Sequence, residues 1–145
     1  TTPWTLPSNT ALTVGPAIDY VLVDTFNQYT FERIKVILAK NLVGKQFSGK
    51  YEETKENEAF ENFTSQEKKI PYRILHECKG TDLVGIRYEQ LLPYALPFEN
   101  AAHAFRVISG DFVTTEDGTG IVHTAPTFGA DDAKVAKEAK PEVPP

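Results

Sequence analysis

Residues 11–24, ALTVGPAIDYVLVD, contain two short apolar runs with a turn between them. The runs at 11–15 and 20–24 are rich in valine, leucine and threonine, residue types that fit extended strands. Pro16 and Asp19 mark the turn between the two runs. Similar short runs recur farther along the chain, at residues 72–75, 83–88, 104–108, 111–114 and 120–125. The sequence therefore predicts a mainly β protein.

Two segments interrupt this pattern and are predicted to be helical. From Thr30 to Asn41, apolar residues recur at three- and four-residue spacing, as on one face of a helix that Gly44 would end. Residues 130–140 form the second predicted helix, with two aspartates in its first turn. Many short strands with a few helices indicate a closed β-barrel-like fold with peripheral α-helices.

Two further stretches concern the connections between these elements. Residues 48–69 crowd together charged side chains, which predicts a surface excursion with a short helix or hairpin. The runs at 104–108 and 111–114 are joined by Ser109-Gly110, and this pattern predicts a β-hairpin.

The composition is that of an ordinary globular domain. Of the 145 residues, 41% are hydrophobic and 24% are charged, so the chain can bury a core and is not mainly disordered. No apolar run approaches the roughly 20 residues of a membrane-spanning helix. The net charge of −5 argues against broad nucleic-acid binding, which needs a basic face. A pocket that holds only the tip of a nucleic acid is still compatible with this charge.

The two ends of the chain indicate a piece of a longer protein. The sequence contains no methionine, position 1 included, and it ends in the proline-rich stretch PEVPP. We therefore expect one domain over residues 1–140, excised from a larger chain, and a cut linker over residues 141–145.

The residue inventory excludes several familiar kinds of site. The three histidines, at positions 76, 103 and 123, are far apart and have no partner at metal-ligand spacing, so no metal site is predicted. Cys78 is the only cysteine, and no motif around it indicates a catalytic nucleophile. Gly118 and Gly120 are not followed by a phosphate-binding pattern and are typical of turns.

Two segments have a composition that is unusual for their position. Residues 1–10, TTPWTLPSNT, combine hydroxyl side chains with two prolines, which predicts either a rigid hydroxyl-lined loop or a plain linker. Residues 118–132, GTGIVHTAPTFGADD, carry His123 to the end of a strand, and Asp131 and Asp132 follow. Helix capping also explains these aspartates, and burial in a core also explains His123. Composition and spacing alone leave the function open.

These segments resemble the two signatures of the editing domain of isoleucyl-tRNA synthetases, an insertion called connective peptide 1. Residues 1–9 are similar to its threonine-rich peptide, and residues 118–132 are similar to its second signature. Related valyl and leucyl enzymes carry Arg-Pro and an acidic residue where this chain has Pro3-Trp4-Thr5. The resemblance covers essentially the whole chain and favours the isoleucyl member of the class I aminoacyl-tRNA synthetases.

The resemblance implies proofreading in protein biosynthesis by hydrolysis of the ester of mischarged valyl-tRNA(Ile). The synthetic site of this family accepts valine in place of isoleucine, because the two differ by one methylene group, which allows only weak discrimination. A second site would therefore admit the valyl group and reject the larger isoleucyl group. The domain would then be an aminoacyl-tRNA deacylase. An alternative is a module that binds valyl-adenosine or valyl-adenylate without turnover when isolated, and a third possibility is an unrelated interaction barrel.

The resemblance also assigns roles to the hydroxyl-rich segment. Thr1, Thr2 and Asn9 are expected to hold the ribose and the ester and to position the attacking water. An aminoacyl ester is activated, so no strong enzyme nucleophile is needed. The full set of expected catalytic and substrate-binding residues is Thr1, Thr2, Trp4, Leu6, Asn9, His123 and Asp132.

In the second segment, an ionised carboxylate is the natural anchor for the substrate's α-ammonium. By motif position this anchor is Asp132, and Asp131 is expected to cap the helix. His123 is expected to form the wall that collides with the extra methylene group of isoleucine.

No metal or cofactor is implied for the editing reaction. The expected partners are the aminoacylated 3′ end of tRNA(Ile) and the remainder of the synthetase, with no membrane. The synthetase would supply most of the tRNA affinity, because the net charge of this chain is negative. A monomer in the cytoplasm is expected.

Overall fold

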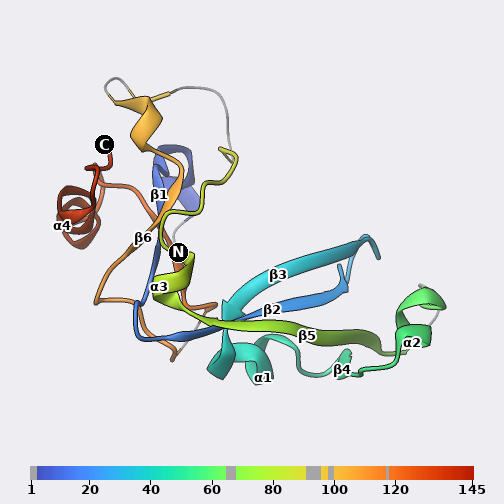
Figure 1. Cartoon of the computed structure of the whole chain (residues 1–145). Coiled ribbons are helices and arrows are strands. Elements are labelled where there is room, and N and C mark those ends of the chain that lie inside the picture. The colour runs from blue at the N-terminus through green and yellow to red at the C-terminus, as the bar shows by residue number, and fades with distance from the viewer. Residues whose placement is uncertain (1–2, 65–67, 91–95, 98–99, 117) are drawn as a thin grey trace. The chain divides into compact units, whose positions relative to one another are not determined.

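The structure is a computed structural model of the chain (Figure 1). It describes residues 3–64, 68–90, 96–97, 100–116 and 118–145, and leaves aside the side chains of residues 3 and 4. The chain forms two compact units. Unit 1 comprises Thr1–Ile18, Lys79–Thr114 and Gly120–Pro145. Unit 2 comprises Asp19–Cys78 and Thr115–Thr119.

Unit 1 is built on a three-stranded sheet in the order β6-β1-β7. The central strand β1 (Ala11–Val14) pairs in parallel with β6 (Arg106–Ser109) and antiparallel with β7 (Ile121–Thr124). The helical elements of this unit are short, with the 3-10 helices η1 (Pro3–Ser8) and η3 (Ala101–His103) and the α-helices α3 (Gly80–Leu83) and α4 (Ala130–Glu138). The unit thus places both signature segments next to one small sheet.

The core of unit 1 lies between α4 and the pair β1–β6 (Figure 1). Its buried members are Ala11, Ile108, Val135, Ala136 and Val143. Gly110 permits the close packing, because a Cβ atom there would lie 2.7 Å from Thr13 and 3.1 Å from Val135. The buried Arg106 donates hydrogen bonds to the backbone oxygens of His103 and Pro141. The linker expected at 141–145 stays a prediction, although Val143 of that stretch is buried.

Unit 2 is built on a four-stranded sheet in the order β3-β2-β5-β4. Its strands are β2 (Asp19–Phe26), β3 (Arg33–Ala39), β4 (Tyr51–Glu53) and β5 (Ile70–Lys79). Its helices are η2 (Lys40–Leu42), α1 (Val43–Gln46) and α2 (Asn57–Glu61). The main core packs the aromatic side chains of Phe47 and Tyr51 against buried residues of the sheet and α1, namely Val21, Val23, Leu38, Val43 and Tyr72.

The helix predicted from Thr30 to Asn41 is wrong, because residues 33–39 form strand β3. Its apolar residues fit a helical period, but Ile34, Val36 and Leu38 also alternate as in a strand, and two of the three are β-branched. The segment forms a strand because it pairs with β2 in a long antiparallel ladder, in which Tyr20 lies opposite Ala39 at one end and Phe26 lies opposite Arg33 at the other. Helical structure begins only after Ala39, so Gly44 lies inside α1 rather than at a helix end.

The predicted hairpin over 104–114 is also wrong. Strand β6 pairs in parallel with β1, and residues 111–114 form no strand. The predicted strand at 83–88 is wrong for its first half, because Leu83 ends α3, whose first turn is capped by the side chain of Asp82. Its second half runs beside residues 105–107 through backbone hydrogen bonds and the isolated bridge of Arg87 with Arg106.

The remaining predictions of secondary structure are confirmed. Residues 11–15, 20–24, 72–75 and 120–125 coincide with β1, β2, β5 and β7, and the helix at 130–140 is α4. The charged stretch 48–69 contains the short helix α2 and the short strand β4. The fold is therefore one of mixed sheets with few helices. The described strands form two separate sheets, so the closed barrel stays a prediction.

Among the described residues of unit 2, the most buried charge is the carboxylate of Asp24, with a side chain that is 1% exposed. Arg33 donates two hydrogen bonds to it, at 2.7 and 3.1 Å, and Arg73 donates two more at 3.2 and 3.3 Å. Both guanidinium groups also lie over the ring of Phe60. The hydrogen bonds from Arg33 hold the pKa of Asp24 below its usual value, against the opposing effect of burial.

We expect Asp24→Asn to destabilise the chain by about 1.5–3 kcal/mol at pH 7, since it removes a charged acceptor from two arginines. Because the pKa of Asp24 is lower in the folded than in the unfolded chain, the ionised carboxylate stabilises the fold above the unfolded pKa. This stabilisation is lost as the pH falls from the unfolded pKa through the folded pKa. Urea unfolding of wild type and variant at pH 7 and in acid measures both effects. Glu52→Gln, at an exposed strand position, is the matched control. Equal stability of Asp24→Asn and wild type at pH 7 would contradict the prediction.

Candidate functional site

The two signature segments lie side by side in unit 1. Strand β1 directly follows the first segment and pairs with β7 of the second, in a register that places Leu12 opposite His123. Next to this ladder, the N–H of Thr10 donates to the backbone oxygen of Thr124 at 3.0 Å. The hydroxyl of Thr5 lies 2.7 Å from Nε2 of His123. Within this segment, residues 3–8 form the 3-10 helix η1.

His123 is 8% exposed and is held at the end of β7. Its Nε2 atom is bound to the Thr5 hydroxyl, and its Nδ1 atom is buried without a hydrogen-bond partner among the described residues. Burial lowers the pKa of His123, while the nearby carboxylate of Asp132 acts in the opposite direction. The imidazole is therefore neutral at pH 7 and presents a fixed ring with one unpaired nitrogen.

Asp132 lies in the first turn of α4 and connects this helix to the end of β7. Its Oδ2 atom accepts a hydrogen bond from the N–H of Ala125 at 3.1 Å. Gly129 leaves room for this arrangement, since a Cβ atom there would lie 3.0 Å from Cγ of Asp132. The positive end of the helix dipole also favours a carboxylate at this position. Asp132 is half-buried, so its carboxylate is held in place and still reachable.

The expectation that Asp131 caps α4 is wrong. The N-cap residue is Gly129, with no side-chain cap, and the Asp131 side chain is exposed. The carboxylate that binds a backbone N–H near the start of the helix is that of Asp132 instead.

A small pocket of about 200 Å³ lies beside the first segment. Asn9 and Thr10 line it together with Phe105 and Thr127, the last of which comes from the second segment. Thr10 is 4% exposed, and its hydroxyl has no hydrogen-bond partner among the described residues. A buried hydroxyl without a partner requires an explanation, and a polar group bound in the adjacent pocket is one such explanation.

The structure brings together only part of the predicted site. Asn9 lines the small pocket, Leu6 is half-buried in η1, and His123 contacts the first segment. Neither His123 nor Asp132 lines the pocket. Thr1 and Thr2 lie outside the described residues, as does the side chain of Trp4. Their expected roles stay predictions.

Three residues that contribute to this region were not singled out from the sequence: Thr5, Thr10 and Tyr88. Thr5 and Thr10 lie in the hydroxyl-rich segment, so its composition indicated them only collectively. The Tyr88 hydroxyl donates to Oδ1 of Asn9 at 2.6 Å across 79 positions of the chain. No local pattern in the sequence signals such a contact.

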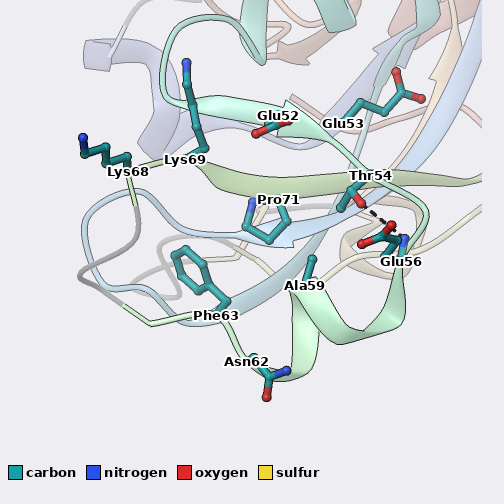
Figure 2. Close-up of a pocket in the computed structure, with 10 residues that line it drawn as sticks. All are labelled: Glu52, Glu53, Thr54, Glu56, Ala59, Asn62, Phe63, Lys68, Lys69 and Pro71. Carbon is teal, nitrogen blue, oxygen red and sulfur yellow. Dashed lines mark hydrogen bonds between the residues drawn. The ribbon is translucent and has the colours of Figure 1, made fainter.

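A larger pocket, of about 810 Å³, lies in unit 2 (Figure 2). Glutamates and lysines surround Phe63 and Pro71 in this pocket. The side chains of these glutamates and lysines are exposed. None of the residues predicted for the site lines it. Within the described ranges, no group of three or more His, Cys, Asp or Glu side chains is placed to hold a metal ion. Among those same residues, no helix has the length and apolar character needed to cross a membrane.

We expect NMR titration of the His123 imidazole to give a midpoint below 6.5, its ordinary pKa. The urea-unfolded chain serves as the reference. Since the unfolded chain binds the proton more readily, stability contributed by neutral His123 is present above the unfolded pKa. It is lost as the pH falls from that value through the folded pKa. A folded midpoint at or above the unfolded one would contradict the burial argument.

No family model matches. The chain is 62% identical over 139 residues to an isoleucine–tRNA ligase of Cytophaga hutchinsonii, covering 96% of this chain and 12% of that protein. It is 58% identical over 139 residues to the isoleucine–tRNA ligase of Bacteroides fragilis, with the same two coverages. For the isoleucine–tRNA ligase of Picrophilus torridus, identity is 39% over 143 residues, covering 99% of this chain and 11% of that protein.

Among solved structures, the fold is similar to the crystal structure of GlLeuRS-CP1, with a TM-score of 0.58 at 20% identity. The match covers 94% of this chain and 41% of that one. The sequence identity to these relatives shows that the chain belongs to an aminoacyl-tRNA synthetase family, and its fold is similar to that of GlLeuRS-CP1. More particularly, the chain corresponds to the editing domain of isoleucine–tRNA ligases, so the resemblance of its two signatures is confirmed. It spans about 12% of the length of these relatives.

Proposed function

We propose that this domain hydrolyses the ester of valyl-tRNA(Ile), as the second sieve of an isoleucine–tRNA ligase in the cytoplasm. The observation that carries the proposal is the convergence of the two signature segments, in which Thr5 binds His123 and Thr10 binds Thr124. The unpaired buried hydroxyl of Thr10 and the unpaired Nδ1 of His123 support a polar ligand in this region. The similarity to isoleucine–tRNA ligases supports the choice of substrate.

In this proposal, Asp132 binds the α-ammonium group of the substrate. Its Oδ2 atom already accepts a hydrogen bond from Ala125, but a carboxylate offers about four lone-pair positions. The backbone N–H of Ala125 orients this carboxylate, and the positive end of the helix dipole favours a carboxylate at this position. A substrate ammonium group would complete a charge-assisted pair with it.

His123 supplies the size limit. Its ring is buried and fixed by Thr5, so it acts as a rigid wall rather than as a proton carrier. An isoleucyl side chain has one methylene group more than a valyl side chain, and a rigid wall excludes it by overlap. This role needs no charge on the imidazole, in agreement with its lowered pKa.

Hydroxyl and amide groups of the first segment position the attacking water, namely those of Thr1, Thr2 and Asn9. The ester is already activated, so positioning of water next to it supplies much of the required rate. A neighbouring ribose hydroxyl of the tRNA assists the water, and the proposal involves no metal or cofactor. The remainder of the ligase supplies most of the tRNA affinity, since the net charge of this chain is −5.

The first test compares hydrolysis of valyl-tRNA(Ile) and isoleucyl-tRNA(Ile) by the chain at high protein concentration. We expect faster loss of the valyl ester. His123→Ala removes the proposed wall, so it should raise isoleucyl hydrolysis toward the valyl rate. Background loss of both esters, with binding of a non-hydrolysable valyl-adenosine analogue, would leave a binding module without turnover. Background loss of both without such binding would refute the proposal.

A second test concerns the ammonium anchor. Asp132→Asn retains an oxygen that accepts from Ala125 but loses the charge, so the fold should persist. We expect kcat/KM for valyl-tRNA(Ile) to fall at least about 30-fold, the equivalent of about 2 kcal/mol for a lost charged partner. Asp131→Asn, at the exposed neighbouring position, is the control. Unchanged deacylation by Asp132→Asn and Asp132→Ala would remove Asp132 from the mechanism.

A further inference from the structure

Tyr88 and Asn9 form a hydrogen bond that joins two distant parts of unit 1. The phenol hydroxyl of Tyr88 donates to Oδ1 of Asn9 at 2.6 Å. Tyr88 lies beyond α3 and is half-buried, and Asn9 lies at the end of the first signature segment. Asn9 lines the pocket of about 200 Å³, so this bond acts on a pocket wall.

Both ends of this bond are anchored on Phe105. The Phe105 ring packs edge-to-face on the Tyr88 ring, with centroids 6.1 Å apart. Its backbone oxygen accepts from the N–H of Tyr88 at 3.0 Å, and its N–H donates to the oxygen of Thr10 at 2.7 Å. Thr10 is the neighbour of Asn9, so Asn9, Thr10, Phe105 and Tyr88 form a closed ring of covalent and hydrogen-bonded contacts.

The backbone conformation of Phe105 indicates that the surrounding contacts hold these four residues in place. Its φ angle is +57°, in the left-handed region that a bulky residue rarely adopts. Such a conformation persists only where surrounding contacts impose it, and it is frequent at ligand-binding sites. Phe105 itself lines the pocket with Asn9. The strained residue, the hydrogen bond and the pocket wall therefore coincide.

The direction of the bond determines what Asn9 can offer a ligand. A side-chain amide has one oxygen acceptor and one NH₂ donor group. The bond from Tyr88 uses one lone pair of the oxygen and fixes the orientation of the amide, so the NH₂ group is available to donate to an acceptor oxygen of the substrate. Burial raises the pKa of Tyr88, so its hydroxyl stays protonated and remains the donor throughout the working pH range.

We infer that Tyr88 is a positioning residue for editing, which orients the Asn9 amide so that its NH₂ group donates to a ribose or ester oxygen of the aminoacyl end. The inference rests on the proposed function, because it takes Asn9 as a residue that contacts that substrate. Tyr88 itself acts only through Asn9.

The test is a double-mutant cycle on the 145-residue chain, with Tyr88→Phe, Asn9→Ala and their combination. Loss of one hydrogen bond to a neutral group predicts that Tyr88→Phe lowers kcat/KM for valyl-tRNA(Ile) about three- to tenfold. It should have no further effect in the Asn9→Ala background. Tyr29→Phe removes a hydroxyl from a side chain that is 80% exposed and is the matched control.

The variant Asn9→Asp distinguishes the acceptor role of the Asn9 side chain from its donor role. A carboxylate still accepts from Tyr88 but cannot donate to the substrate, so this variant should keep the urea midpoint of the wild type and show the hydrolysis defect of Asn9→Ala. It also tests the donor role if Tyr88→Phe fails to fold. Wild-type hydrolysis by Asn9→Asp would overturn the inference, as would multiplicative losses for Tyr88→Phe and Asn9→Ala.

The outcomes distinguish this inference from the proposed function. If the wild-type chain hydrolyses valyl-tRNA(Ile) and Tyr88→Phe matches Tyr29→Phe, only the inference fails. If the chain binds the non-hydrolysable valyl-adenosine analogue without turnover, the same cycle is measured on its Kd, with the same expected ratios. If the wild-type chain neither hydrolyses the ester nor binds the analogue, both proposals fail.

Discussion

The pairing of β1 with β7 is the contact on which the candidate site depends, because each strand adjoins one signature segment. Their antiparallel ladder sets Leu12 opposite His123 and Thr10 beside Thr124, although more than 110 positions separate the partners. Within the ladder, the fully buried hydroxyls of Thr13 and Thr124 bind each other, so neither polar group is left unpaired in the sheet. A slip of one residue would break this pair and turn His123 to the opposite face. The register therefore determines whether His123 can meet Thr5 at all.

The chemistry suited to this arrangement needs few charges. The region combines hydroxyls, an amide, a neutral imidazole and one carboxylate, and hydrogen bonds to neighbouring residues orient the imidazole, the amide and the carboxylate. Such a site suits an activated ester, for which placement of water and exclusion of a larger substrate matter more than a strong nucleophile. The left-handed backbone of Phe105 is a further sign that surrounding contacts determine the shape of the pocket wall, since a bulky residue rarely adopts this conformation on its own. Unit 2 is stabilised differently: the buried carboxylate of Asp24 accepts hydrogen bonds from both Arg33 and Arg73.

The errors in secondary structure have a common physical cause. The apolar residues between Thr30 and Asn41 satisfy both a helical and a strand period, and only the partner strand β2 selects the strand. The hairpin expected at 104–114 had a suitable turn, but residues 106–109 pair in parallel with β1, whose residues lie about 95 positions earlier. Strand pairing is chosen by the whole fold, so short-range signals predict that a strand exists better than they predict its partner. Where the pattern was unambiguous, as at 20–24 and 130–140, the predictions were confirmed.

The sequence by itself determined the mainly β character, the terminal helix and the two signature segments with Asn9, His123 and Asp132, because each of these is a local pattern of residue types. Only the tertiary structure decided that Thr5 binds His123, that Asp132 rather than Asp131 holds the end of β7, and that Tyr88 binds Asn9. The physical reason is that a hydrogen bond depends on positions within about 3 Å in space. Those positions follow from strand register and helix packing over the whole unit, and no spacing along the chain encodes them directly.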